Sequence, residues 1–307
     1  MAGHEWSLVL FTVVMQMAVG AFVMLGGVHW FAKKWYGLEQ ADRMSDRALV
    51  AIGPAVVFAL LATLFHLGNP INGPRALVHV ASSWLSREIL LSLVFSGGGA
   101  VFAFMQWRKL GTAPARNLLA LCVAAVGLVL VFAMSMVYRL PTVPAWNTGA
   151  TIVTFFVTTF LLGGMAMGCA LVGNYWYLRD PGAAPVEPAF AILAISLRWV
   201  AVVSVALLGV QFVVIPVYLS QLANDPAPAA AASLVLLAQQ NGVALVLRLV
   251  LLFAGAGLLA LVVYVMAASE SRVRLLGNTA LLAFAMVFVS EILGRYLFYA
   301  SMVRIGL

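Results

Sequence analysis

Residues 243–268 read VALVLRLVLLFAGAGLLALVVYVMAA and contain a single charged side chain, that of Arg248. A helix needs about 20 mainly apolar residues to cross the hydrocarbon core of a bilayer. This stretch is long enough, so it predicts a membrane-spanning helix. The rest of the chain can be searched for further stretches of this length and composition.

The composition of the whole chain agrees with this stretch. Of 307 residues, 64% are hydrophobic and 9% are charged, and the mean hydropathy is +1.07. Soluble proteins contain about 45–50% apolar and about 25% charged residues. The composition therefore excludes a soluble enzyme and a nucleic-acid-binding protein, and the net charge of +7 is read first as a signal of membrane topology.

Eight segments are apolar and long enough to span, and turn residues such as Gly68-Asn69-Pro70 and Asp225-Pro226 separate them. They are Leu8–Phe31, Ala48–Leu67, Ile89–Trp107, Leu118–Val137, Thr151–Val172, Phe190–Leu219, Val243–Ala268 and Leu275–Tyr299. The stretch Ala229–Gln239 is too short to span and predicts a surface helix. No loop is long enough to fold alone. We expect an all-α integral membrane protein: one eight-helix bundle over residues 1–307.

Basic residues are distributed unevenly over the loops. Ten follow the first, third, fifth and seventh segments: Lys33, Lys34, Arg43, Arg47, Arg108, Lys109, Arg116, Arg179, Arg272 and Arg274. The opposite side holds four: Arg75, Arg87, Arg139 and Arg304. Because cytoplasmic loops are richer in Lys and Arg, we expect both termini and the loops Gly68–Arg87 and Tyr138–Ala150 on the non-cytoplasmic side.

Ionisable residues inside spans are costly in free energy and are candidates for function. Here they are His66, Glu88, Arg198, Arg248, Glu291 and Arg295. With this topology, all except Arg198 lie near the outer surface, on four helices. Glu291 and Arg295 are four residues apart and can pair, and Arg248 can neutralise Glu291 or reach lipid phosphates. Arg198 is expected at the cytoplasmic interface.

His66 and Glu88 flank one outer loop, so they are expected near each other. A neutral imidazole can accept a hydrogen bond from a hydroxyl group, and a carboxylate can take the released proton. This pair suits a proton-accepting site at the edge of an apolar cavity. The structural alternative is a histidine wetted by lipid headgroups, with Glu88 stabilised by the dipole at its helix N-terminus.

Metal cofactors are not expected in this chain. Cys122 and Cys169 are too few for an iron–sulfur cluster and lack CxxC spacing. A b-type haem usually takes two facing histidines, and none of the other three histidines is expected in the bilayer at the level of His66.

Five short strings resemble the membrane-anchor subunit of dimethyl sulfoxide reductase, and they follow that family's order along the whole chain. They are His4-Glu5-Trp6 with Gln16, Phe65-His66-Leu67-Gly68-Asn69-Pro70, Leu85-Ser86-Arg87-Glu88-Ile89, Thr142-Val143-Pro144-Ala145-Trp146 and Glu291-Ile292-Leu293-Gly294-Arg295. The resemblance implies a haem-free, eight-helix anchor in the inner (cytoplasmic) membrane of a prokaryotic cell. The anchor would oxidise menaquinol and pass electrons to a ferredoxin-like, four-cluster iron–sulfur subunit, which feeds a molybdopterin catalytic subunit.

The resemblance also implies that His66 binds quinol with Glu88 beside it. Gln16, Tyr138, Arg139 and Arg248 are expected to complete the polar wall of an otherwise apolar quinol pocket. The terminal acceptor would be reduced on another polypeptide. Two other functions are kept open: a haem-free anchor of polysulfide or nitrite reductase type, and a transporter. A transporter should carry a midplane site and broken helices, whereas the polar residues here gather at one face.

Overall fold

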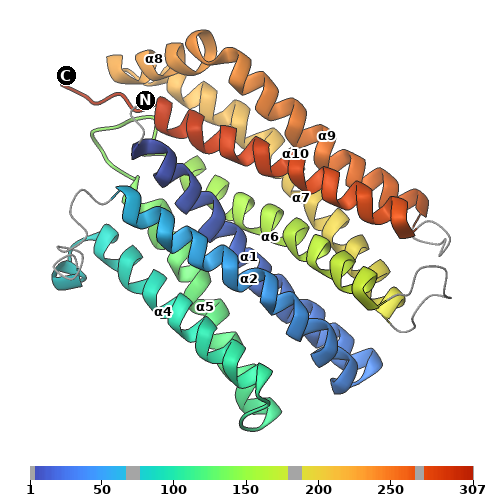
Figure 1. Ribbon diagram of the computed structural model, residues 1–307. Coiled ribbons are helices and arrows are strands. Elements are labelled where there is room, and N and C mark those ends of the chain that lie inside the picture. The colour runs from blue at the N-terminus through green and yellow to red at the C-terminus, as the bar shows by residue number, and fades with distance from the viewer. Residues whose placement is uncertain (1–3, 67–76, 179–188, 267–272, 307) are drawn as a thin grey trace.

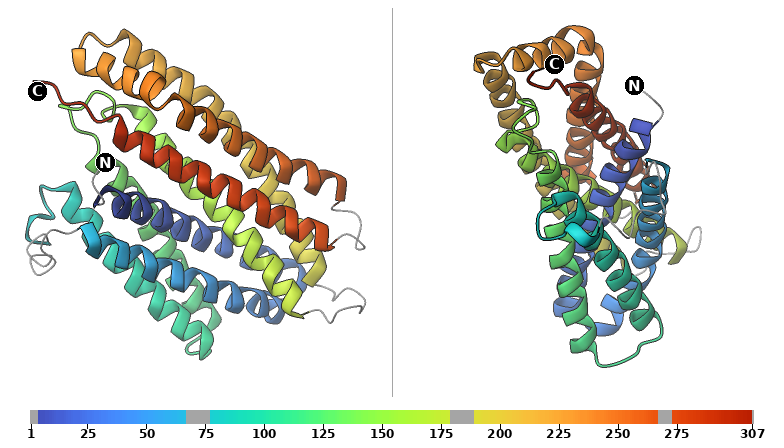
Figure 2. Two further views of the ribbon diagram at one scale, coloured as in Figure 1. Left: turned by 45° about the horizontal axis from the view of Figure 1, so that its top comes forward. Right: turned by 90° about the vertical axis from the view of Figure 1, so that its left-hand side faces the viewer.

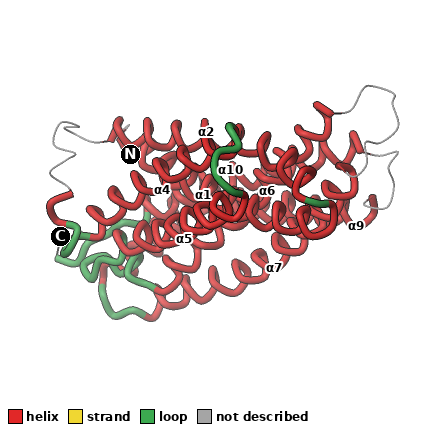
Figure 3. The backbone as a smooth tube through the Cα atoms, turned by 90° about the horizontal axis from the view of Figure 1, so that it is seen from below, coloured by secondary structure: helices red, strands yellow, loops and turns green. Residues whose placement is uncertain are grey.

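A computed structural model describes residues 4–66, 77–178, 189–266 and 273–306, and within these ranges all regular structure is helical (Figures 1 and 3). The long helices are α1 (His4–Tyr36), α2 (Leu38–His66), α4 (Trp84–Trp107), α5 (Ala113–Val137), α6 (Gly149–Leu178), α7 (Ala189–Asn224), α9 (Gly242–Met266) and α10 (Val273–Ala300). Each contains an apolar stretch long enough to cross a membrane, so the eight predicted spans are confirmed as helices.

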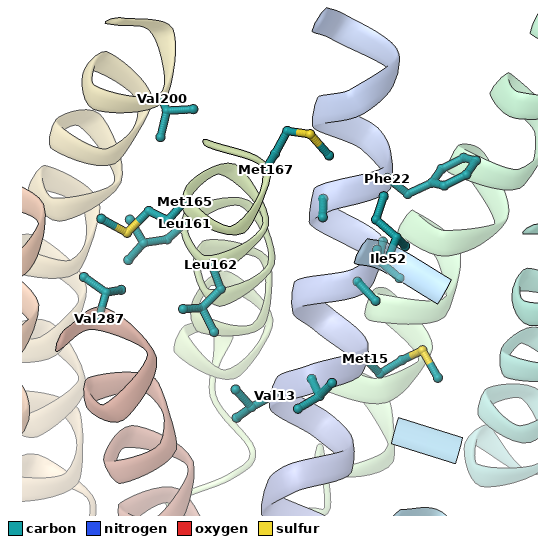
Figure 4. Packing of buried hydrophobic residues seen from close by; sticks show 14 of the residues in the cluster. Val13, Met15, Phe22, Ile52, Leu161, Leu162, Met165, Met167, Val200 and Val287 are labelled. Carbon is teal, nitrogen blue, oxygen red and sulfur yellow. The ribbon is translucent and has the colours of Figure 1, made fainter. Parts of the chain in front are cut away.

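The helices are arranged around a central pair, α1 and α6 (Figures 1 and 2). On one side lie α2, α4 and α5, and on the other lie α7, α9 and α10. Both central helices carry buried apolar side chains, among them Val13 and Met15 on α1 and Leu161 and Leu162 on α6 (Figure 4). Successive spans run in opposite directions, so residues far apart in sequence meet at each end.

Two glycines set the separation of the central pair. A Cβ atom added to Gly163 on α6 would overlap the backbone of Gly20 on α1, and one added to Gly20 would overlap the carbonyl of Thr159. Only glycine allows backbones to approach this closely, which is how small residues tighten helix contacts in membranes. The central pair therefore has a fixed register and little freedom to separate.

The first connection is much shorter than predicted. The sequence pattern placed a loop between Phe31 and Ala48, but α1 continues to Tyr36 and α2 begins at Leu38. Gly37 alone makes the turn, with a φ of 86°, a conformation that glycine adopts without steric cost. Arg43 and Arg47 consequently lie on α2 instead of in a loop.

The predicted surface helix Ala229–Gln239 also differs in the structure. It consists of α8 (Pro228–Val235) followed by a π-helical turn, η3 (Leu236–Gln240). Ala229, Ala230 and Ser233 are buried, so α8 packs against the bundle. The other short helix is a 3₁₀ turn, η2 (Leu77–His79).

We call the two ends of the bundle the terminal end, where α1 begins and α10 finishes, and the basic end, where α1 turns into α2 (Figure 1). Eight of the ten basic residues assigned to one side lie at or near the basic end. Arg179 and Arg272 are outside the described residues, as is Arg75 on the other side. The uneven distribution of basic charge is therefore a property of the folded bundle.

Candidate functional site

Arg295 is the centre of a buried polar cluster at the terminal end. It is 5% exposed, although it lies within a span. Its guanidinium donates a hydrogen bond of 2.9 Å to Oε1 of Gln16 on α1 and lies 3.7 Å from the ring centre of Phe155 on α6. A desolvated guanidinium over an aromatic face is a favourable cation–π contact. Arg295 thus connects α10 to both central helices.

Glu291, one turn before Arg295, points to a different partner. Its Oε2 accepts a hydrogen bond of 2.6 Å from the hydroxyl of Thr158 on α6. Among the described residues, neither Arg295 nor Arg248 forms an ion pair with it. The ion pair that the i, i+4 spacing allows is therefore not formed: the two residues are close enough to interact electrostatically, but each side chain makes its hydrogen bond to another helix.

Aromatic side chains enclose the cluster. The hydroxyls of Tyr138, which caps the end of α5, and Tyr299 on α10 are 2.8 Å apart and buried. Trp146 stacks on Phe298 and donates a 2.7 Å hydrogen bond to its carbonyl oxygen. Tyr138 lies beyond the end of its span, and burial together with Tyr299 raises the pKa of its phenol. Its hydroxyl therefore stays protonated at neutral pH and can donate a hydrogen bond.

A pocket adjoins this cluster between α6, α7, α9 and α10. Its empty volume is about 760 Å³, including the part that opens to the surroundings, and most of its lining is apolar. Thr158, Arg248, Glu291 and Arg295 provide polar groups on its wall. An apolar cavity with a few convergent polar groups is typical of sites for small organic ligands.

Gly294 makes room for Arg248 in this pocket. A Cβ atom added to Gly294 would lie 2.6 Å from Nε of Arg248 and 2.8 Å from its Cζ. The guanidinium therefore rests directly on the backbone of α10. Arg248 reaches the pocket wall only because position 294 has no side chain.

Several buried polar atoms of the site have no hydrogen-bond partner within the described part of the chain. They are Nε2 of Gln16, Nε of Arg248, Oε1 of Glu291 and Nε of Arg295. Leaving a buried donor or acceptor unsatisfied costs about 1–3 kcal/mol, more for a charged group. Three of these atoms belong to residues that line the pocket, and Gln16 is hydrogen-bonded to one of those residues, Arg295. Such a group of unsatisfied atoms indicates a site built to exchange hydrogen bonds with a ligand.

The structure brings together some of the predicted site residues. Glu88 is buried at the start of α4, close enough to Arg295, Tyr138 and Tyr299 to interact with them electrostatically. Arg139 follows Tyr138, and its buried Nε has no described partner.

His66 is the last residue of α2, but its side chain lies outside the described residues, as do Gly68, Asn69 and Pro70. Arg198 is exposed in the first third of α7. It lies toward the basic end, and its place at the cytoplasmic interface stays a prediction.

Other residues of the site were not predicted from the sequence. Thr158, Tyr299 and Gly294 are uncharged and lie in apolar runs, where no spacing rule marks them. The only available signal was their proximity in sequence to Glu291 and Arg295, and this applies to Gly294 and Tyr299 alone. The described residues contain no group of three or more His, Cys, Asp and Glu side chains suited to a metal ion.

The basic end carries a second polar network. Asp42 on α2 accepts hydrogen bonds from Gln106 (3.0 Å) and Lys109 (3.0 Å), and its Oδ1 lies 3.2 Å from Nε2 of His29. The same Gln106 accepts a 2.8 Å bond from Arg116 on α5. Asp46 binds Gln106 and Lys109 in the same way. These bonds join α1, α2, α4 and α5.

Comparison with known proteins gives a consistent result. Residues 1–301 match the family described as the DMSO reductase anchor subunit (DmsC). The chain is 35% identical over 162 residues to the anaerobic dimethyl sulfoxide reductase chain YnfH of Escherichia coli (strain K12), covering 52% of this chain and 55% of that protein.

Two further relatives are chains C of anaerobic dimethyl sulfoxide reductases. That of Haemophilus influenzae is 30% identical over 173 residues, 55% of this chain and 59% of the relative. That of Escherichia coli (strain K12) is 29% identical over 198 residues, 62% of this chain and 65% of the relative. In each case the matched region spans less than two thirds of the relative.

Proposed function

Because the chain belongs to the family of DMSO reductase anchor subunits, we propose that it binds and oxidises menaquinol at the terminal end of its bundle. The electrons would pass to an iron–sulfur subunit seated on that end and from there to a molybdopterin catalytic subunit. The chain would hold this assembly at the inner membrane of a prokaryotic cell, with both termini and the terminal end on the non-cytoplasmic side.

The observation that carries this proposal is the group of unsatisfied buried polar atoms beside an apolar pocket. A quinol has two hydroxyl groups that donate and accept hydrogen bonds, on a ring attached to an apolar tail. The ring hydroxyls match orphaned atoms such as Oε1 of Glu291 and Nε2 of Gln16. The tail matches the apolar lining from α7 and α9, which includes Val214 and Leu245.

Oxidation of a quinol releases two electrons and two protons, so the site needs proton acceptors near the ring. We propose that His66, at the end of α2, accepts the proton from the quinol hydroxyl. Glu88, which is buried at the start of α4, then carries that proton onward. The guanidinium of Arg295 lies close enough to the carboxyl groups of Glu88 and Glu291 to interact with both electrostatically. Gln16, Tyr138, Arg139 and Arg248 orient the ring.

The proposal is tested by substituting the two proton acceptors in the assembled complex. His66→Ala should abolish quinol-driven turnover and leave activity with an artificial soluble electron donor intact, because that donor bypasses the anchor. Glu88→Gln should slow the same reaction and shift its pH dependence, since the amide keeps hydrogen bonding but cannot take a proton. General acid–base catalysis typically contributes about 10²–10⁴-fold.

His79→Ala is the matched control, because His79 is an exposed histidine in η2 at the same end. Co-purification of the partner subunits is measured for all three variants, so that loss of assembly is separated from loss of chemistry. Unchanged menaquinol oxidation in an assembled His66→Ala complex would refute the assignment of His66. The quinol site would then be sought nearer Glu291 and Arg248.

A further inference from the structure

A second and larger cavity lies at the basic end, between α1, α4 and α5. We call it the basic-end groove. Its empty volume is about 1110 Å³, including the part that opens to the surroundings. Its walls are mainly apolar, formed by Phe22, Phe102, Leu121 and Ala124 together with Gly26. A Cβ atom at Gly26 would meet no other atom within 4 Å, so the groove is open along α1.

The polar groups of the groove are gathered at its end near the α1–α2 turn. They include His29, Lys33 and Asn117. Trp30, which also lines the groove, is 65% exposed, and the ammonium of the neighbouring Lys34 lies 5.4 Å from its ring. Exposed tryptophan and lysine at the end of a spanning helix are typical of the lipid headgroup level. The groove therefore runs from the headgroup level into the hydrocarbon region.

The charge at the polar end is positive. Asp42, which lies 3.2 Å from the groove residue His29, is also engaged by Gln106 and Lys109. Lys33 is exposed and forms no ion pair with any residue that the structure describes. An anion bound at this end could pair with the ammonium group of Lys33, because the carboxylate of Asp42 is already engaged by other side chains.

The apolar part of the groove offers little to a ligand that needs hydrogen bonds there. Gln106 lines it, but its amide nitrogen donates to Asp42 and Asp46 and its oxygen accepts from Arg116. A quinone head would leave its ring oxygens unsatisfied against Phe22 and Phe102. A long acyl chain has no such requirement.

We propose that the basic-end groove binds one anionic phospholipid, with the phosphate at Lys33 and Asn117 and an acyl chain between Phe22, Phe102 and Leu121. Basic pockets between membrane helices bind phosphate headgroups in this way. The lipid fills a space between α1 and α5 that no side chain fills, and so completes the packing on that side of the central pair.

The test measures which lipids remain with the full chain after purification in a mild detergent. Wild-type protein should retain about one phosphatidylglycerol per chain, quantified by mass spectrometry. Gly26→Leu fills the groove and should abolish retention. Lys33→Gln removes one basic residue near the membrane surface and should lower phosphatidylglycerol affinity about fivefold.

Two matched controls separate the groove from the rest of the surface. Gly97→Leu adds the same side chain at an exposed glycine of α4 that also meets no atom within 4 Å, and Arg108→Gln removes an exposed cation at the same end outside the groove. Both should retain the lipid as the wild type does. Because Lys33 is exposed, its variant should fold even if Gly26→Leu does not.

A second measurement identifies the part of the ligand that is recognised. Added phosphatidylglycerol should raise the unfolding temperature of the delipidated wild type, whereas phosphatidylcholine and inorganic phosphate should not. Equal retention by wild type and Lys33→Gln would overturn the proposal. So would retention of menaquinone or only zwitterionic lipid, or a response to inorganic phosphate alone.

Discussion

At the basic end Asp42 is within hydrogen-bond distance of three side chains, one on α1, one on α4 and one just beyond the end of α4, whereas at the terminal end Glu291 accepts one bond, from Thr158. Both carboxylates are on spanning helices, and both have basic side chains nearby. The first is fully engaged in ion pairs and hydrogen bonds. The second keeps one oxygen unsatisfied beside a pocket.

This difference separates structural polar groups from functional ones. A buried charge that is paired and hydrogen-bonded holds helices together, and removing its partner is costly. A buried charge that is left partly unsatisfied lowers stability, so its retention calls for another role. We therefore interpret the polar network of the basic end as a structural clamp, a set of bonds that holds α1, α2, α4 and α5 together. We interpret the terminal end as the reactive site. Four substitutions test this contrast.

The largest effect is expected from Asp42→Ala at the basic end. It removes the acceptor of His29 and one of the two carboxylates that Gln106 and Lys109 share, which leaves Asp46 alone. Because hydrogen bonds to charged groups contribute about 1.5–3 kcal/mol each, the free energy of unfolding should fall by about 3 kcal/mol. Thermal unfolding in detergent and the yield of folded protein measure this. Glu39→Ala is the control, because its pair with Arg43 is exposed and should contribute less than about 1 kcal/mol. Equal losses in the two variants would contradict the clamp.

Glu291→Gln at the terminal end should give the opposite pattern. The amide oxygen can still accept from Thr158 and no ion pair is broken, so the free energy of unfolding should change by less than about 1 kcal/mol. Quinol-driven turnover should fall about a hundredfold, equivalent to about 2.7 kcal/mol in the activation barrier, since a neutral amide replaces the charged acceptor of the quinol hydroxyl. A variant with normal turnover but a stability loss like that of Asp42→Ala would make Glu291 a structural residue.

Gly294→Ala should have a smaller effect on the same pocket. The added methyl group would collide with the Arg248 guanidinium, and overpacking of this kind costs about 1–3 kcal/mol. We expect the KM for quinol to rise about tenfold (about 1.4 kcal/mol), measured by steady-state kinetics with a soluble quinol analogue. Gly257→Ala on α9, where a Cβ meets nothing within 4 Å, should leave KM unchanged and slightly stabilise the helix. Identical kinetics in both variants would remove Arg248 from the pocket wall.

The smallest effect is expected from Tyr299→Phe. It breaks the hydrogen bond with the Tyr138 hydroxyl and should lower the free energy of unfolding by about 1 kcal/mol. Tyr177→Phe, at a side chain that is 78% exposed, should change nothing measurable. If the two variants unfold at the same temperature, the paired hydroxyls contribute no stability to the aromatic enclosure.

The helices could be predicted from sequence because a span depends on a local property, about 20 apolar residues in a row. The start of α2 was placed ten residues late, at Ala48 instead of Leu38, because its first three turns contain Asp42, Arg43 and Asp46. These residues look like a loop in the sequence. The partners of Asp42 and Asp46 lie far away in the sequence, on α1 and at the end of α4, so the signal that would correct the error is not local.

The candidate site was predictable in part for the same reason. The position of an ionisable residue inside an apolar span identified Glu88, Arg248, Glu291 and Arg295 as candidates, each on its own. Which of them meet could not be derived, because an i, i+4 spacing favours the pair Glu291–Arg295, whereas the folded chain gives each residue a partner on another helix. Competition between a partner on the same helix and partners on other helices leaves no pattern in the sequence.

The hydrogen bond between Arg295 and Gln16 joins residues that are 279 positions apart. At about 5–20 residues per second of synthesis, Gln16 enters the membrane on the order of half a minute before its partner exists. During that interval α1 has α2 and later α6 beside it, but the amide of Gln16 faces no guanidinium. Since α10 carries both Glu291 and Arg295, the polar cluster of the terminal end is the last part of the described bundle to be assembled. A chain that stalls before α10 would be inserted, helical and inert.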